Sequence, residues 1–147
     1  MYTFKHSIFI NRSPQAVFNY ITDLANSAQW QSAAGVDSTE WITEGATRVG
    51  SVYKIVAKFM GGKVESKNEI TAWNPPAGYS FKGDTGLLRG DMTREFESQD
   101  EGTLFTHTGH IEVRGLFRLM EGLMGKMFEK RLATEFAVLK TVFESNK

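Results

Sequence analysis

The stretch VYKIVAKFMGGKVESKNEI, residues 52–70, decides the fold class. Apolar and polar side chains alternate on both sides of Gly61-Gly62, which is the period of a β-strand with one buried face. A two-residue turn at these glycines pairs Phe59 with Val64 and puts the apolar faces of both strands on the same side. The stretch therefore predicts an antiparallel hairpin that forms part of a half-buried wall.

The flanking sequence extends this pattern into an α+β fold. A strand from Tyr2 to Ile10 comes first, and Ser13 and Pro14 then cap and start a short helix. A second short helix covers 23–31, and about six strands follow between Val36 and Val113. Segregated helices beside a run of strands are typical of an antiparallel sheet. With no linker or repeat, residues 1–147 are expected to form one domain.

Strand phasing identifies one inward-facing wall of the sheet. A turn within 100–102 puts Arg94 and Phe96 on the same side as Phe105 and His107, whichever turn pair is used, because only the parity matters. The predicted ligand-facing residues of the sheet are Tyr53, Ile55, Phe59, Asn68, Tyr79, Phe81, Met92, Phe96 and Phe105.

A helix of about 30 residues, 115–146, closes the chain. One broad face of it carries Phe117, Met120, Met124, Met127 and Phe128, all predicted to contact a ligand. Methionine fills irregular gaps, so this face suits an adaptable wall, and ordinary core packing is the alternative. Arg131 and Glu135 lie one turn apart and are expected to form a solvated or half-buried ion pair, with ligand contact as the alternative.

Composition and charge exclude several function classes. The 17 Lys and Arg balance 17 Asp and Glu, which argues against a nucleic-acid-binding protein. Without cysteine there is no disulfide or thiolate site, and three histidines at these spacings make a metal site improbable. The sequence contains no phosphate-binding loop, so no nucleotide cofactor is expected. The chain has no apolar run of membrane-spanning length, and the cytoplasm is the expected compartment.

Several local motifs resemble one known family. They are Ile10-Asn11-Arg12-Ser13-Pro14 leading to Val17-Phe18, Asp23 leading to Trp30, Trp73-Asn74-Pro75-Pro76, and the closing Leu139-Lys140 to Glu144 helix. Together they are similar to the polyketide cyclase/dehydrase and lipid-transport superfamily, also called START-like or SRPBCC. The resemblance implies a helix-grip fold, in which a curved sheet of about seven strands grips the C-terminal helix around a hydrophobic cavity. It implies no fixed catalytic set.

Five polar residues face the predicted interior: His6, Ser66, Asn68, Arg94 and His107. His6 and His107 are candidates for acid–base catalysis, because the first and last strands are neighbours in the helix-grip fold. Arg94 is a candidate for holding an oxyanion. The alternatives are satisfied core histidines and an Arg94 ion pair with Glu69 or Glu95 at the sheet rim. The glycine-rich segment 83–90 is either a gate at the cavity mouth or a flexible hairpin tip.

Three functional hypotheses follow from these residues and the resemblance. The first is binding of a small hydrophobic or amphipathic molecule between sheet and helix, with transport of that molecule as its extension. The second is a cyclase or dehydratase that uses His6, Arg94 and His107 without a metal. The third is a chaperone-cofactor or partner-binding module, which predicts an exposed apolar patch. The sequence leaves the ligand's identity and the oligomeric state open.

Overall fold

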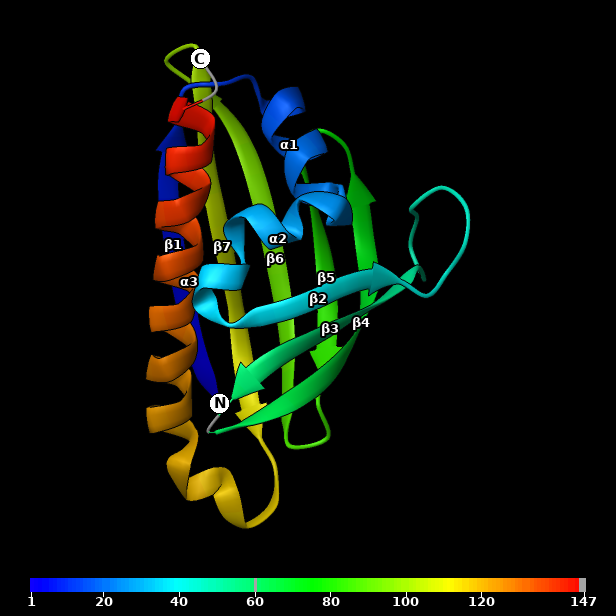
Figure 1. Ribbon diagram of the computed structural model, residues 1–147, viewed down its shortest axis with the longest axis vertical. Helices are drawn as coiled ribbons and strands as arrows, with labels where there is room; N and C mark the ends of the chain where they lie inside the picture. Colours follow the sequence, from blue (N-terminus) through cyan, green and yellow to red (C-terminus); the bar gives the residue numbers. More distant parts are fainter. Residues whose placement is uncertain (60, 146–147) are drawn as a thin grey trace.

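A computed structural model describes residues 1–59 and 61–145. Figure 1 shows a curved sheet with a long helix along one side. The strands are β1 (Tyr2–Ile10), β2 (Val36–Trp41), β3 (Val52–Phe59), β4 (Gly62–Asn74), β5 (Gly78–Asp84), β6 (Leu88–Gln99) and β7 (Gly102–Val113). The α-helices are α1 (Pro14–Thr22), α2 (Ser27–Trp30) and α3 (Glu121–Ser145). Short 3₁₀ turns are η1 (Leu24–Asn26), η2 (Ser32–Ala34) and η3 (Gly115–Met120).

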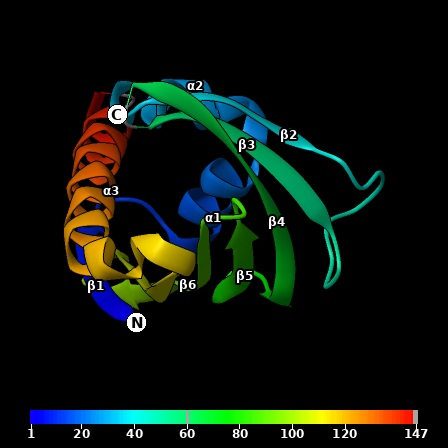
Figure 2. The ribbon, with the colours of Figure 1, turned by 90° about the horizontal axis from the view of Figure 1, so that it is seen from below.

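The seven strands form one antiparallel sheet in the order β1-β7-β6-β5-β4-β3-β2. Seen from below, the sheet bends so that β2, β3 and β4 arch over the interior while α3 lies beside β1 (Figure 2). The helix α3 contacts β1 at one sheet edge and α2 and η2 near the other, so it closes the open side of the curve. The predicted α+β class and helix-grip arrangement are confirmed.

Local signals explain where α1 begins. The Ser13 side chain accepts a hydrogen bond from the Ala16 backbone N–H at 3.2 Å, and Pro14 occupies the first helical position, as predicted. Val17, Phe18 and Ile21 then recur at helical spacing and are all buried. The Phe18 ring lies 5.2 Å from the Trp73 ring and fixes α1 over the sheet.

The first hairpin differs from its prediction by two residues in register. Phe59 lies opposite Gly62 rather than Val64, so Gly62 belongs to β4 and not to the turn. Gly61 has a φ of +82°, which a glycine adopts without strain. Because the shift is two residues, the parity is unchanged and the same side chains face inward.

The β6–β7 hairpin has the predicted phasing. Arg94 pairs with His107, and Phe96 with Phe105. Asp100 and Glu101 turn the chain with φ values of +47° and +67°, the left-handed pair of a two-residue hairpin. The sheet thus brings Arg94 and His107 side by side.

The C-terminal helix is shorter than predicted. Gly115, with a φ of +68°, turns the chain into η3, and the long helix α3 starts only at Glu121. The Glu121 carboxylate accepts a hydrogen bond from the Val113 backbone N–H at 3.1 Å, which ties this start to the end of β7. The predicted end at Asn146 lies outside the described residues.

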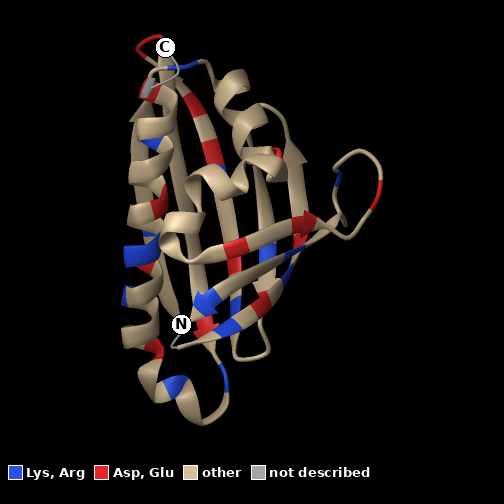
Figure 3. Cartoon of the chain, in the orientation of Figure 1, with Lys and Arg blue, Asp and Glu red and all other residues tan. Residues whose placement is uncertain are grey.

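The buried stripe of α3 packs on β1 and β7. Leu132, Phe136 and Leu139 are fully buried, and the Phe136 ring lies 4.9 Å from that of Phe105. Gly125 lets the helix approach β1, because a side chain there would overlap the Tyr2 ring. On the face seen in Figure 3, lysines and arginines alternate with acidic residues along the strands and along α3.

Candidate functional site

A cavity of about 310 Å³ lies between the concave face of the sheet, α3 and the α2–β2 segment. This volume is at the lower end of the range for small-molecule pockets, about 300–1,000 Å³. Arg94 and His107 line it, and so do ten of the predicted ligand-binding residues: Tyr53, Ile55, Phe59, Asn68, Tyr79, Phe81, Met92, Met124, Met127 and Phe128.

Four predicted ligand-binding residues do not line the cavity. Phe96 and Phe105 are buried in the core, with their rings stacked 5.0 Å apart. Phe117 and Met120 belong to η3, which precedes the regular helix α3, and half of Phe117 is exposed. The helical projection failed for these two because it assumed a regular helix from Gly115.

His6 and His107 are direct cross-strand partners, as the neighbouring strands predicted, yet only His107 lines the cavity. The His6 ring packs against Phe136 of α3, with 5.0 Å between ring centroids. The helix therefore lies over His6, and the predicted pair of imidazoles does not face one cavity.

Arg94 is a buried cation held by its neighbours on the sheet. Its Nε donates a hydrogen bond to His107 Nδ1 at 3.2 Å, and its Nη1 donates one to the Tyr79 hydroxyl at 2.8 Å. The guanidinium carbon also lies 5.2 Å from the centre of the Phe81 ring and 5.6 Å from that of Trp30, within cation–π range.

The alternative role of Arg94, a rim ion pair with Glu69 or Glu95, is not found among the described residues. Glu69 instead pairs with Lys82 at 3.7 Å on the outer face. Within the described part of the chain, no carboxylate oxygen lies within 4.0 Å of the Arg94 guanidinium. The charge is therefore balanced only at longer range.

His107 is neutral, and one of its ring nitrogens has no hydrogen-bond partner among the described residues. Burial lowers its pKa well below the usual value, and the charge of Arg94 and the neighbouring His6 act in the same direction. Since Nδ1 accepts from Arg94, the ring proton of the neutral form is on Nε2. That Nε2 is buried without a hydrogen-bond partner among the described residues.

Two other buried polar atoms share this condition, and both belong to cavity-lining residues. They are Trp30 Nε1 and Thr39 Oγ1. An unsatisfied buried donor costs about 1–3 kcal/mol, and native proteins contain few of them. Three residues of the cavity wall thus have a polar atom whose hydrogen-bonding capacity the described protein does not use.

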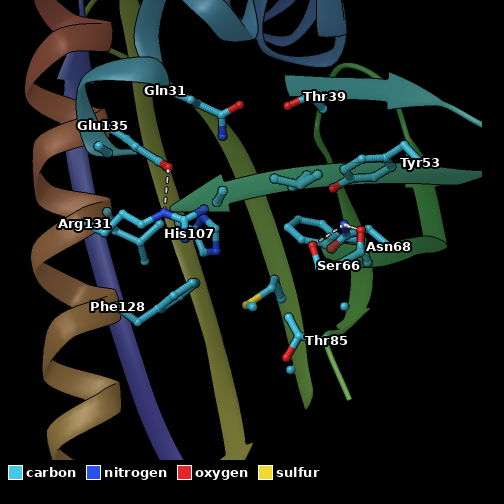
Figure 4. A pocket seen from close by; sticks show the side chains of 18 of the residues that line it. Gln31, Thr39, Tyr53, Ser66, Asn68, Thr85, His107, Phe128, Arg131 and Glu135 are labelled. Atoms are coloured by element: carbon cyan, nitrogen blue, oxygen red, sulfur yellow. Dashed lines mark hydrogen bonds and ion pairs between the residues drawn. The ribbon is translucent and has the colours of Figure 1, made fainter. Parts of the chain in front are cut away.

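Arg131 and Glu135 extend from α3 toward the sheet (Figure 4). Arg131 Nε donates to Glu135 Oε1 at 3.5 Å, so the predicted ion pair exists and Arg131 is half-buried. The prediction of a solvated or half-buried Glu135 is wrong, because only 2% of the residue is exposed. Burial raises the pKa of Glu135, against the opposing charges of Arg131 and Arg94. Both residues line the cavity.

The opposite wall carries an amide and a hydroxyl. Asn68 Nδ2 donates to Ser66 Oγ at 3.1 Å, as drawn in Figure 4. Gly83 packs against this pair, and a Cβ there would lie 2.6 Å from Asn68 Oδ1. A glycine is therefore required where β5 passes the Asn68 side chain.

The segment 83–90 is more ordered than a free loop. Its ends belong to β5 and β6, and Leu88 N–H donates to Thr85 Oγ1 at 2.9 Å across the tip. Arg114 pairs with Asp84 at 3.0 Å beside it. Thr85 and Leu88 line the cavity, so this tip is at its boundary.

Sequence reasoning missed Trp30 and Gln31. Both are buried and line the cavity, because α2 turns its last residues inward over the sheet. The one available signal was a large aromatic in an otherwise polar short helix. Among residues 1–59 and 61–145, no group of acidic or histidine side chains is arranged to hold a metal ion. In the same residues, no helix is both long and apolar enough to cross a membrane.

Comparisons with known proteins identify a family and a set of structures with the same fold. The family model described as polyketide cyclase / dehydrase and lipid transport matches residues 1–144. A search of curated proteins found no match. Among solved structures, the protein TTHA0849 from Thermus thermophilus is 21% identical, with a TM-score of 0.80 and 99% of each chain covered.

Two further structures show the same fold at lower identity. A START superfamily protein from Mycobacterium smegmatis has a TM-score of 0.82 at 9% identity, with both chains fully covered. The di-domain ARO/CYC BexL of the BE-7585A biosynthetic pathway has a TM-score of 0.75 at 15% identity, over 96% of this chain and 46% of that one. At these identities the likeness shows the fold alone.

Proposed function

The chain belongs to the polyketide cyclase / dehydrase and lipid transport family, and from this premise we propose that it binds a small hydrophobic or amphipathic molecule in the cavity between the sheet and α3. One observation carries the proposal: aromatic, aliphatic and methionine side chains enclose about 310 Å³ beside a few inward-facing polar groups. A largely apolar space with few polar groups is the usual design of a small-molecule site.

The wall chemistry supports an apolar ligand. Tyr53, Phe81 and Phe128 present ring surface from strands and helix, and Met92, Met124 and Met127 present flexible thioethers. Burying apolar ligand surface here is worth roughly 25 cal/mol for each Å² removed from water. Methionines adjust to ligands of different outline at little cost.

The test is a variant that fills the cavity. Ile55→Trp adds volume on the inner face of β3, and Val56→Trp adds a similar bulk at the next residue, which points to the other face of the sheet. We expect Ile55→Trp to weaken binding of the neutral fluorescent probe N-phenyl-1-naphthylamine at least tenfold, while Val56→Trp leaves it within twofold. Equal binding by both variants, or no binding by the wild type, would overturn the proposal.

A second candidate, cyclisation or dehydration of a polyketide-like substrate, is favoured by the Arg94–His107 hydrogen bond at the cavity wall. His107 is then the only imidazole available for proton transfer among the described residues, because His6 does not line the cavity. Incubation of a linear poly-β-ketone thioester with wild type and His107→Gln tests it. Accelerated ring closure by the wild type alone supports the enzyme, and equal rates exclude it.

A further inference from the structure

Charge is distributed unevenly between the cavity and the rest of the chain. Overall, 17 basic residues balance 17 acidic ones. The residues that line the cavity include one carboxylate, Glu135, and four cations, Lys58, Arg89, Arg94 and Arg131. Lys58 and Arg89 are exposed, and Lys58 pairs with Asp37 at 3.9 Å, so Arg94 and Arg131 are the buried and half-buried cations of the wall. Glu135 is already paired with Arg131. Arg94 is the buried cation for which the described part of the protein supplies no close anion.

Around Arg94, the nitrogen atoms without a hydrogen-bond partner among the described residues are donors. The guanidinium of Arg94 has donors beyond the two that bind His107 and Tyr79, and its Nη2 makes no hydrogen bond within the described residues. His107 Nε2 and Trp30 Nε1 are buried and unpaired N–H groups. All three residues are neighbours, since Arg94 contacts His107 at 3.2 Å and stacks 5.6 Å from the Trp30 ring centre.

These groups match one class of acceptor. A carboxylate offers two oxygens with about four lone-pair sites, which suits a guanidinium fork and adjacent N–H donors. A buried guanidinium without a counter-ion is costly, and a bound anion supplies the missing charge. A neutral carbonyl would accept one or two hydrogen bonds and leave the charge unbalanced.

We propose that the natural ligand is an amphipathic anion, an apolar skeleton bearing a carboxylate, whose oxygens are received by Arg94, His107 and Trp30. This proposal rests on the proposed function and adds the ligand's charge and orientation to it. The carboxylate lies against β6 and β7, and the skeleton lies against the aromatic wall formed by Tyr53, Phe81 and Phe128.

The experiment compares matched pairs of acids and amides on the same skeleton. 2-Naphthoate and 2-naphthamide, and octanoate and octanamide, compete at pH 7.5 with N-phenyl-1-naphthylamine, a reporter without charge. We expect at least one carboxylate to displace the reporter at a tenfold or more lower concentration than its amide. Arg94→Met is expected to abolish this preference while the amide's affinity changes less than threefold. Arg94→Lys keeps the cation and is expected to restore part of it.

Lys67→Met is the matched control, because it removes an exposed cation from β4 outside the cavity. It should leave the carboxylate preference unchanged. Should Arg94→Met fail to fold, the wild-type ratio and Trp30→Phe, which removes the N–H together with one ring of the indole, decide the question.

The outcomes separate the two proposals. If the reporter binds and no carboxylate outcompetes its amide, the inference about charge is wrong and cavity binding still holds. A preference that survives in Arg94→Met also overturns the inference. If the reporter does not bind to the wild type, the proposed function itself fails.

Discussion

The buried neutral imidazole of His107 makes a specific prediction about stability at acid pH. We consider His107→Gln, which removes the titrating group and keeps an uncharged polar side chain at this position. In the folded protein burial, Arg94 and His6 keep the pKa of His107 well below its ordinary value. In the unfolded chain the same side chain takes up a proton near pH 6.5.

The size of the effect follows from this difference. Between about pH 6.5 and the lower folded pKa, the unfolded state binds one more proton than the folded state. The contribution of His107 is therefore fully present above about pH 6.5 and is lost as the pH falls, by about 1.4 kcal/mol per pH unit. As the pH falls below about 6.5, the wild-type unfolding free energy should therefore fall relative to that of His107→Gln, by up to about 1.4 kcal/mol per pH unit, until the folded pKa is reached.

Urea denaturation followed by fluorescence of the three tryptophans measures this at a series of pH values. His110→Gln is the control, because it removes a partly exposed imidazole from the other face of the same strand, where it pairs with Asp91 at 3.0 Å. The control should retain the acid-dependent loss seen in the wild type. Parallel pH profiles for wild type and His107→Gln would refute the reasoning, because they would mean that His107 titrates alike in both states.

Glu135→Gln should change the pH profile in the opposite sense: the pKa of Glu135 is raised by burial, so its contribution is present below about pH 4.5 and is lost as the pH rises through the folded pKa. Relative to the wild type, the variant should gain stability as the pH rises above about 4.5, and a relative loss there would contradict the assignment. On α3, Gly122→Ala should stabilise by up to about 1 kcal/mol, because nothing lies within 4 Å of the added methyl. Gly125→Ala should destabilise by about 1 kcal/mol, because the methyl would meet the Tyr2 ring, with Cδ2 at 2.6 Å; denaturant melts that show equal gains for both would disprove the close approach.

Strand alternation predicted the sheet side of the site well. The prediction that Arg94 and His107 share the inward face required only the parity of the turn, which is a local property of the sequence, and the structure adds that they are direct partners. The register of the first hairpin differs from the prediction by two residues, because two adjacent glycines allow more than one turn position. Of the two, only Gly61 has a positive φ.

The helical side of the site was predicted only in part: Met124, Met127 and Phe128 line the cavity as predicted. Arg131 and Glu135 have the spacing of an exposed ion pair, and the burial of Glu135 depends on how α2 and η2 pack against α3. Phe117 and Met120 fit a helical stripe, but the chain enters η3 before the helix begins. The burial of Glu135 depends on contacts between segments distant in sequence, which periodicity does not encode, whereas Phe117 and Met120 were misplaced by the local turn at Gly115.

The β6–β7 hairpin has a consequence for how this protein can be redesigned. Arg94 and His107 lie thirteen residues apart on one hairpin whose turn is defined by Asp100 and Glu101. Thr39 and Trp41, which also line the cavity, belong to β2, a strand outside this hairpin. Ligand outline can therefore be altered by substitutions in β2 while the polar anchor is kept, so a library confined to that strand would explore new molecules that share one head group.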